Sequence, residues 1–113
     1  MIDMYEIEEY IATDGRSPFA EWLNGLKDKR AQARLLTRLD RAVLGNLGDW
    51  KLLADAEGLA ELRDPYGPGY RVYFTFAGST LIVLLAGSTK RDQSRAIARA
   101  KAYLADYRRR SRR

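Results

Sequence analysis

Two short alternating segments around a turn constrain the fold of this 113-residue chain more than any other feature. Residues 61–74 read Glu-Leu-Arg-Asp-Pro-Tyr-Gly-Pro-Gly-Tyr-Arg-Val-Tyr-Phe. Two such runs on either side of a turn rich in Pro and Gly predict a β-hairpin with a longer loop. Side chains alternate between the two faces of a strand. If Leu62 and Val72 point into the core, Arg63, Arg71 and Tyr73 stand together on the opposite face, which Glu61 shares.

That second face of the hairpin has two interpretations. Two guanidinium groups beside a phenol suit a phosphate with a nucleic-acid base stacked next to it. Alternatively, the face is an ordinary solvated sheet surface on which Glu61 pairs with an arginine. The alternation of the strands agrees with both interpretations.

The composition removes several kinds of chemistry. The chain has no cysteine and no histidine, which excludes disulfides, thiolate metal sites and the commonest general base. Catalysis would have to use Lys, Arg, Tyr, Asp or Glu, and we expect neither a metal nor a cofactor. No apolar run approaches the roughly 20 residues of a membrane span and no signal peptide is visible. We therefore expect a cytoplasmic protein without a membrane partner.

The net charge of +5 comes from the end of the chain. Five of the residues in 108–113 are arginines, and 15 basic residues balance 15 acidic residues in 1–107. We expect one domain over 1–107 and a basic tail over 108–113. Such a tail is typical of an arm for nucleic acid or an acidic partner. It is equally typical of a frayed, solubilising end.

The part of the chain before the hairpin predicts one strand and two helices. Residues 5–11 alternate and predict a strand with Tyr10 on its outer side. Ser17, followed by a proline, is typical of a helix N-cap, and the short helix after it places Trp22 in the core. A second helix is expected from about residue 28 to residue 44, where apolar residues recur at helical spacing.

The second helix also carries four arginines at helical spacing: Arg30, Arg34, Arg38 and Arg41. Arginines so arranged can bind phosphates. They also fit a solvated face opposite the apolar stripe, and the amphipathic pattern favours this second interpretation.

The remaining segments complete a small α+β domain. Within residues 50–58, the run 51–53 is expected to form a short strand or an extended approach to the hairpin, and residues 77–79 form a second turn. The continuously apolar run 81–86 predicts a strand covered on both faces, and residues 92–107 have helical spacing. The expected order is β-α-α-β-β-β-α, with a small antiparallel-rich sheet, two N-terminal helices and one C-terminal helix.

Several segments of the sequence together resemble a known family. The hairpin run, the apolar strand that leads into Gly-Ser-Thr-Lys at 87–90, and Gln93, Ile97 and Ala100-Lys101 resemble toxins of the RelE/HigB group. These toxins belong to type II toxin–antitoxin modules, and the phage-derived addiction-module killer proteins are the most similar subgroup. The resemblance covers most of the chain and implies a RelE-like fold.

The resemblance implies a ribosome-dependent, metal-independent endoribonuclease that inhibits translation. Its substrate would be mRNA in the ribosomal A site. The 2′-hydroxyl of the substrate would attack the adjacent phosphate and leave a cyclic phosphate and a free 5′-hydroxyl. The implied partner is a cognate helix-turn-helix antitoxin, through which alone the protein would contact operator DNA.

The family's functional residues carry over to six positions. Arg63 and Arg71 would contact the phosphate, and Lys90 would act as a base or an electrostatic group. The residues implied in substrate binding are Tyr66 and Tyr73, by stacking on bases, and the basic residue Lys51 before the hairpin.

The chain departs from the family pattern at Thr89 and Ala96, where relatives often carry Asp. These departures argue against an acid role in the loop after the last strand.

Two further functions fit the resemblance. Related folds include gyrase poisons of the ParE type, which bind a topoisomerase and have no nuclease chemistry. An inactive toxin homologue that only sequesters antitoxin is the other alternative.

Overall fold

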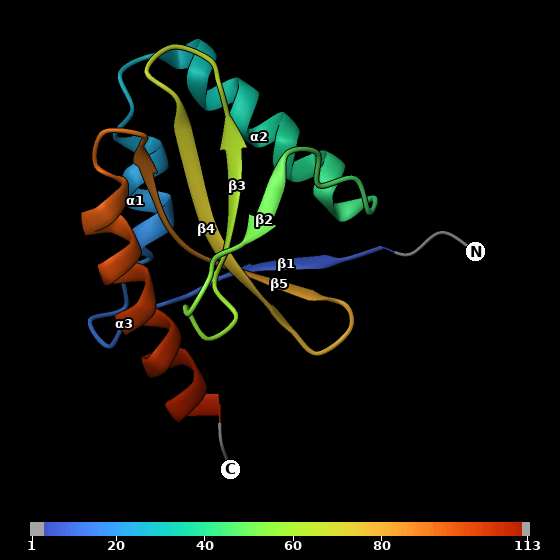
Figure 1. Ribbon diagram of the computed structural model, residues 1–113, viewed down its shortest axis with the longest axis vertical. Helices are drawn as coiled ribbons and strands as arrows, with labels where there is room; N and C mark the ends of the chain where they lie inside the picture. Colours follow the sequence, from blue (N-terminus) through green and yellow to red (C-terminus); the bar gives the residue numbers. More distant parts are fainter. Residues whose placement is uncertain (1–3, 112–113) are drawn as a thin grey trace.

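The computed structural model describes residues 4–111 and has a five-stranded sheet with helices on both faces (Figure 1). The predicted α+β class is confirmed, and residues 50–58 contribute a short additional strand, which makes the order β-α-α-β-β-β-β-α. The elements are β1 (Glu6–Glu9), α1 (Pro18–Asn24), α2 (Lys29–Val43), β2 (Trp50–Leu52), β3 (Ala60–Asp64), β4 (Tyr70–Ala77), β5 (Leu81–Thr89) and α3 (Gln93–Ser111).

The strand order in the sheet is β1-β5-β4-β3-β2. β1 runs parallel to β5, and the other neighbours are antiparallel. β5 is buried along most of its length, as its apolar sequence predicts, because it has a strand on each side and helices on both faces. None of the helices within residues 4–111 is long and apolar enough to cross a membrane.

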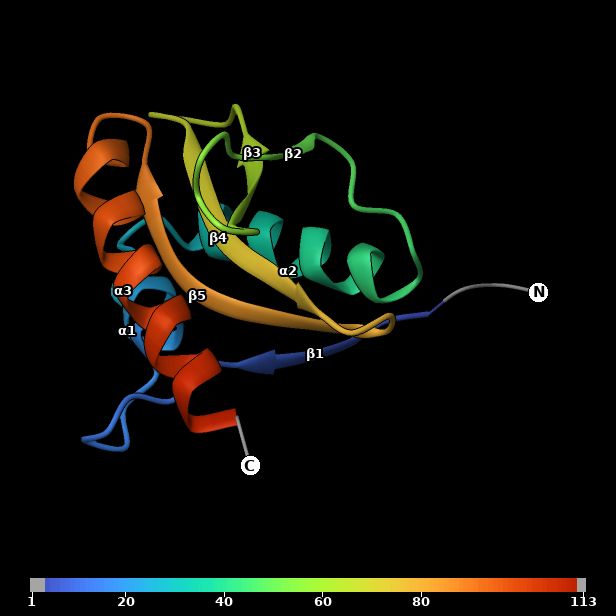
Figure 2. The same cartoon turned by 60° about the horizontal axis from the view of Figure 1, so that its bottom comes forward.

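Two hydrophobic cores lie on opposite faces of the sheet. The first joins α1 and α2 to the hairpin face that includes Leu62 and Val72. The second joins α3 to the other face, where Tyr73 and Leu85 are fully buried. Figure 2 shows α3 on the opposite side of the sheet from α2. The expectation of an exposed second face on the hairpin is therefore wrong where α3 covers it.

Both N-terminal helices begin at a capping side chain, and the cap at Ser17 is the predicted one. The Ser17 hydroxyl accepts a hydrogen bond from the Ala20 N–H at 3.1 Å, and Asp28 caps α2 in the same way. Trp22 packs against the first core, as predicted, and its ring lies where a side chain at Gly87 would be. Glycine at position 87 therefore allows α1 to approach β5 closely.

The first strand is shorter than its alternation predicts. β1 ends at Glu9, and Tyr10 is buried whereas Ile11 is exposed. The Tyr10 ring stacks on Tyr103 of α3, and its hydroxyl donates a hydrogen bond to Asp106 at 2.5 Å. Contacts with α3 thus turn Tyr10 inward, which the sequence period does not anticipate.

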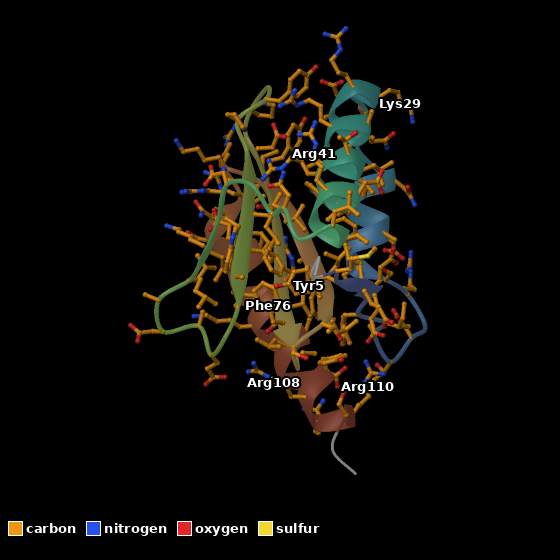
Figure 3. All side chains as sticks on the ribbon, turned by 90° about the vertical axis from the view of Figure 1, so that its right-hand side faces the viewer. Tyr5, Lys29, Arg41, Phe76, Arg108 and Arg110 are labelled. Carbon is orange, nitrogen blue, oxygen red and sulfur yellow. The ribbon has the colours of Figure 1, made fainter. Side chains whose placement is uncertain are left out.

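The predicted boundary between domain and tail at residue 107 falls inside a helix. α3 continues through Ser111, and Figure 3 shows Arg108 and Arg110 on its C-terminal part. The Arg110 guanidinium pairs with Asp106 and lies over the Tyr10 ring. Asp106 and Arg110 are four residues apart in the helix, a spacing at which an ion pair stabilises the last turn. The final two arginines of the expected tail lie outside the described residues.

Three of the four arginines on α2 are exposed, as the favoured interpretation predicts, whereas the side chain of Arg38 is only 14% exposed. Arg34 and Arg38 both pair with the buried carboxylate of Asp64, at 3.1 and 3.4 Å. Arg38 also donates to the backbone carbonyls of Arg63 and Leu47, at 2.6 and 3.2 Å. These contacts join α2 to the end of β3.

The pKa of Asp64 is lowered from its ordinary value. Burial alone would raise it. The backbone N–H of Tyr66 and the guanidinium groups of Arg34 and Arg38 act in the opposite direction and prevail. Asp64 is therefore ionised in the folded protein, although its side chain is only 2% exposed.

We expect Asp64→Asn to lower the free energy of unfolding at neutral pH by about 2 to 4 kcal/mol, because it leaves two arginines without a buried counter-charge. A lowered pKa stabilises the fold above the ordinary aspartate pKa of about 4. That stabilisation is lost as the pH falls through the lower folded pKa, so the difference between wild type and variant should shrink in acid. Urea denaturation across this range measures it, with Asp40→Asn on the exposed side of α2 as the control. A penalty that stays constant into acid would contradict the linkage.

Candidate functional site

A cleft of about 520 Å³ opens beside the loop that joins β3 to β4. Figure 1 shows this loop at one end of the molecule, next to the loop that leads from β5 into α3. We call it the hairpin cleft, and its lining residues are Asp49, Arg63, Pro65, Gly67, Pro68, Gly69, Arg71 and Lys90.

The sheet register brings the three basic residues of the cleft together. Arg63 on β3 stands directly opposite Arg71 on β4, as the hairpin pattern predicts. The N–H of Lys90 donates to the carbonyl of Gly69 at 2.9 Å, which ties the end of β5 to the hairpin loop. Gly69 has a φ of +81°, a conformation that favours glycine. The turn chemistry of the loop therefore helps to place Lys90 beside the arginines.

Arg63 is held by the segment that precedes β2. Its Nη2 donates a hydrogen bond to Asp49 Oδ1 at 2.8 Å, and its backbone N–H donates to the Asp49 carbonyl at 2.9 Å. The hydrogen bond and charge of Asp49 raise the pKa of the Arg63 guanidinium. Its side chain is 34% exposed, so Arg63 is charged and accessible from the cleft.

Arg71 is held by a carboxylate inside the protein. Its Nε lies 2.8 Å from Glu61 Oε1, and the Glu61 side chain is fully buried. Gln93 of α3 donates from Nε2 to both Glu61 oxygens, at 3.2 and 3.0 Å. The predicted Arg–Glu pair thus exists, but it lies under α3 and is not solvated. It offsets the repulsion between two arginines on directly opposite strand positions.

Tyr73 is not available to stack on a base. It is fully buried in the second core, and its hydroxyl lies 3.0 Å from Ser88 Oγ. Burial raises the pKa of its phenol. The expected substrate-binding role of Tyr73 is therefore wrong, because α3 covers this part of the hairpin face.

Tyr66 and Lys51 lie outside the lining of the cleft. Tyr66 packs against the first core, with the Arg34 guanidinium 5.1 Å from its ring centre. Lys51 is exposed on the edge strand β2, opposite Glu61 in the register. The structure thus unites Arg63, Arg71 and Lys90 and leaves the three substrate-binding candidates apart from them.

Asp49 is a cleft residue to which the sequence analysis assigns no role. It follows a glycine-rich helix end, where an aspartate is an ordinary turn residue. Only the pairing of β2 with β3 brings it beside Arg63. No local pattern distinguishes it from the other exposed acids of the chain.

The cleft is equipped to bind an anion. Three cationic groups face one space, and two of them are guanidinium groups that suit the oxygens of a phosphate. Within residues 4–111 no group of three or more Asp and Glu side chains is arranged to hold a metal ion. The chemistry that these residues support is electrostatic stabilisation of a phosphate group.

These features define a small α+β protein with an arginine-lined cleft at the end of a β-hairpin. A scan against protein-family models finds no match. An uncharacterised protein of Haemophilus influenzae is 42% identical over 83 residues, which cover 74% of this chain and 82% of that protein. The chain belongs to the same family as this Haemophilus protein.

We expect the two cleft arginines to differ in their contribution to stability. Arg71→Ala should lower the free energy of unfolding by about 3 kcal/mol, because it leaves the buried Glu61 carboxylate without its counter-charge. Arg63→Ala removes a partly exposed ion pair and should cost less than about 1 kcal/mol. Urea denaturation of both variants measures the difference. The double variant Glu61→Gln/Arg71→Ala, which has no charge at position 61, should recover part of the loss. Equal losses in the two single variants would contradict this assignment.

Proposed function

We propose that this protein is the toxin of a type II toxin–antitoxin system and acts as a ribosome-dependent, metal-independent mRNA endoribonuclease. The observation that carries the proposal is the convergence of Arg63, Arg71 and Lys90 on one cleft. These are the three positions to which the resemblance to RelE/HigB toxins assigns the chemistry. The proposed place of action is the cytoplasm, where translating ribosomes are found.

The proposed reaction depends above all on stabilisation of the negative charge that develops on the phosphate. The 2′-hydroxyl of the substrate loses its proton and attacks the adjacent phosphorus. The bond to the 5′-oxygen breaks and this oxygen takes up a proton, so that the products are a 2′,3′-cyclic phosphate and a 5′-hydroxyl. Negative charge grows on the phosphate oxygens in the transition state. Arg63 and Arg71 would bind these oxygens, and the exposed Lys90 would supply a third positive charge.

We expect Arg63→Ala to reduce cleavage by a hundredfold or more, about the effect of losing one charged contact used in the transition state. Lys90→Ala should also impair cleavage. For Arg71 the informative variant is Arg71→Lys, which keeps a charge beside Glu61 but loses the planar fork of the guanidinium. Primer extension on mRNA bound to translating ribosomes measures each variant.

Arg41→Ala is the matched control for these variants, because it removes an exposed arginine of α2 outside the cleft. Its cleavage should equal that of the wild type. Full activity in the Arg63 and Lys90 variants would remove the cleft from the mechanism. Absence of cleavage by the wild type, together with DNA damage in cells, would favour the gyrase-poison alternative.

The proposed partner is a cognate helix-turn-helix antitoxin that also binds operator DNA. The basic groups of the hairpin cleft, together with the exposed Arg30 and Arg41 of α2, suit acidic segments of such a partner. We expect the two proteins to co-purify from cells that carry both genes, and added salt to weaken the complex. Separate elution of the two proteins at moderate salt would rule this partner out.

A further inference from the structure

Two acids accompany the two arginines of the hairpin cleft, and they differ in exposure. Glu61 is fully buried, and its oxygens contact Arg71 and Gln93. Asp49 lines the cleft, and its side chain is 57% exposed. One acid therefore belongs to the protein interior, whereas the other faces the open cleft.

One carboxylate oxygen of Asp49 is available to accept a hydrogen bond. Arg63 donates its hydrogen bond to Asp49 Oδ1, and Oδ2 has no donor among residues 4–111. The backbone of Asp49 is held independently, since its carbonyl accepts from the Arg63 N–H and, at 3.4 Å, from Arg38 Nη2. The carboxylate thus lines the cleft with capacity to accept at least one more hydrogen bond.

The ion pair between Asp49 and Arg63 contributes little to the stability of the fold. An ion pair between partly exposed groups contributes only about 0 to 1 kcal/mol. A carboxylate among three cations also weakens the attraction of the cleft for a plain anion. Asp49 is useful in an anion-binding cleft if the ligand carries a hydrogen-bond donor next to its negative charge.

A ribonucleotide chain is a ligand of this kind. Its phosphodiester group supplies the negative charge, and the neighbouring 2′-hydroxyl supplies the donor. DNA offers the same phosphate without the hydroxyl, and the 2′-hydroxyl is the group by which proteins distinguish the two nucleic acids. Arg63 would then touch the phosphate and Asp49 together, which places the two recognition groups side by side.

We propose that Asp49 accepts a hydrogen bond from a ribose 2′-hydroxyl and so makes the hairpin cleft selective for RNA over DNA. This inference rests on the proposed function, because it takes RNA as the ligand of the cleft. Asp49 is thereby a specificity-determining residue, distinct from Glu61, which positions Arg71 from within the core.

Binding of short oligonucleotides to the free protein tests the inference without ribosomes. Three hexanucleotides of one uracil-containing sequence serve as probes, with 2′-hydroxyl, 2′-deoxy and 2′-fluoro sugars, and NMR titration at low salt gives their affinities. The wild type should bind the hydroxyl form about tenfold more tightly than the other two, the effect of one modest hydrogen bond to a charged group. Asp49→Ala should bind all three equally, and bind the deoxy form more tightly than the wild type does.

Asp40→Ala is the control, because it removes an equal charge from the exposed side of α2 and should keep the wild-type preference. Equal affinities in the wild type, a preference that survives in Asp49→Ala, or no binding of any probe would overturn the inference. If Asp49 instead contacts a base, the Asp49→Ala substitution should weaken binding of all three probes alike, because the probes share their bases. The preference between sugars would then be unchanged, and the inference would be overturned. Primer extension on ribosomes tests the proposed function separately. Cleavage of mRNA together with equal binding of the three probes would contradict only the inference about Asp49. Preferential binding of the hydroxyl probe without mRNA cleavage would contradict only the proposed enzymatic activity.

Discussion

The ion pair between Arg71 and the buried Glu61 is the interaction on which the hairpin cleft depends. α3 covers the sheet face on which Glu61 lies, so its carboxylate must find its partners within the protein, and it finds them in Arg71 and Gln93. Arg71 would otherwise face Arg63 across the two strands with nothing to offset their repulsion. The pair therefore allows two guanidinium groups to stand together before any anion binds, which is the preorganised arrangement that stabilises a developing charge.

The other side of the hairpin is supported by a second buried carboxylate. Neighbouring residues of a strand point to opposite faces, so Asp64 points toward α2 whereas Arg63 points toward the cleft. Arg34 and Arg38 bind Asp64, and the N–H of Tyr66 donates to it at 2.9 Å. The contacts of Asp64 with α2 thus fix the end of β3 on one face of the sheet, while Arg63 on the opposite face lines the cleft. The basic residues of α2 nearest the hairpin have a structural role as well as a charge.

Local patterns predicted much of the hairpin, including one face with Leu62 and Val72 and another with Arg63 and Arg71, and the register confirms both. They failed where distant segments decide the environment. The alternation of Tyr73 with buried residues predicts an exposed side chain, but α3 covers it. Asp49 reads as a turn residue, and only the pairing of β2 with β3 brings it to Arg63. These misses share one cause, because a local pattern says nothing of which distant segment will lie against a residue.

The sequence by itself determined the elements whose signals are local. The cap at Ser17, the glycine-rich hairpin loop and the apolar run of β5 follow from dihedral preferences and from spacing along the chain. The tertiary structure alone decided which charged groups are buried, because burial depends on contacts between segments far apart in sequence. Glu61 and Gln93 are 32 positions apart, and Tyr10 and Asp106 are 96 apart. The same packing of α3 that buries Glu61 and Tyr73 leaves Arg63, Lys90 and Asp49 at the cleft, and thereby separates buried residues from cleft-lining residues around one hairpin.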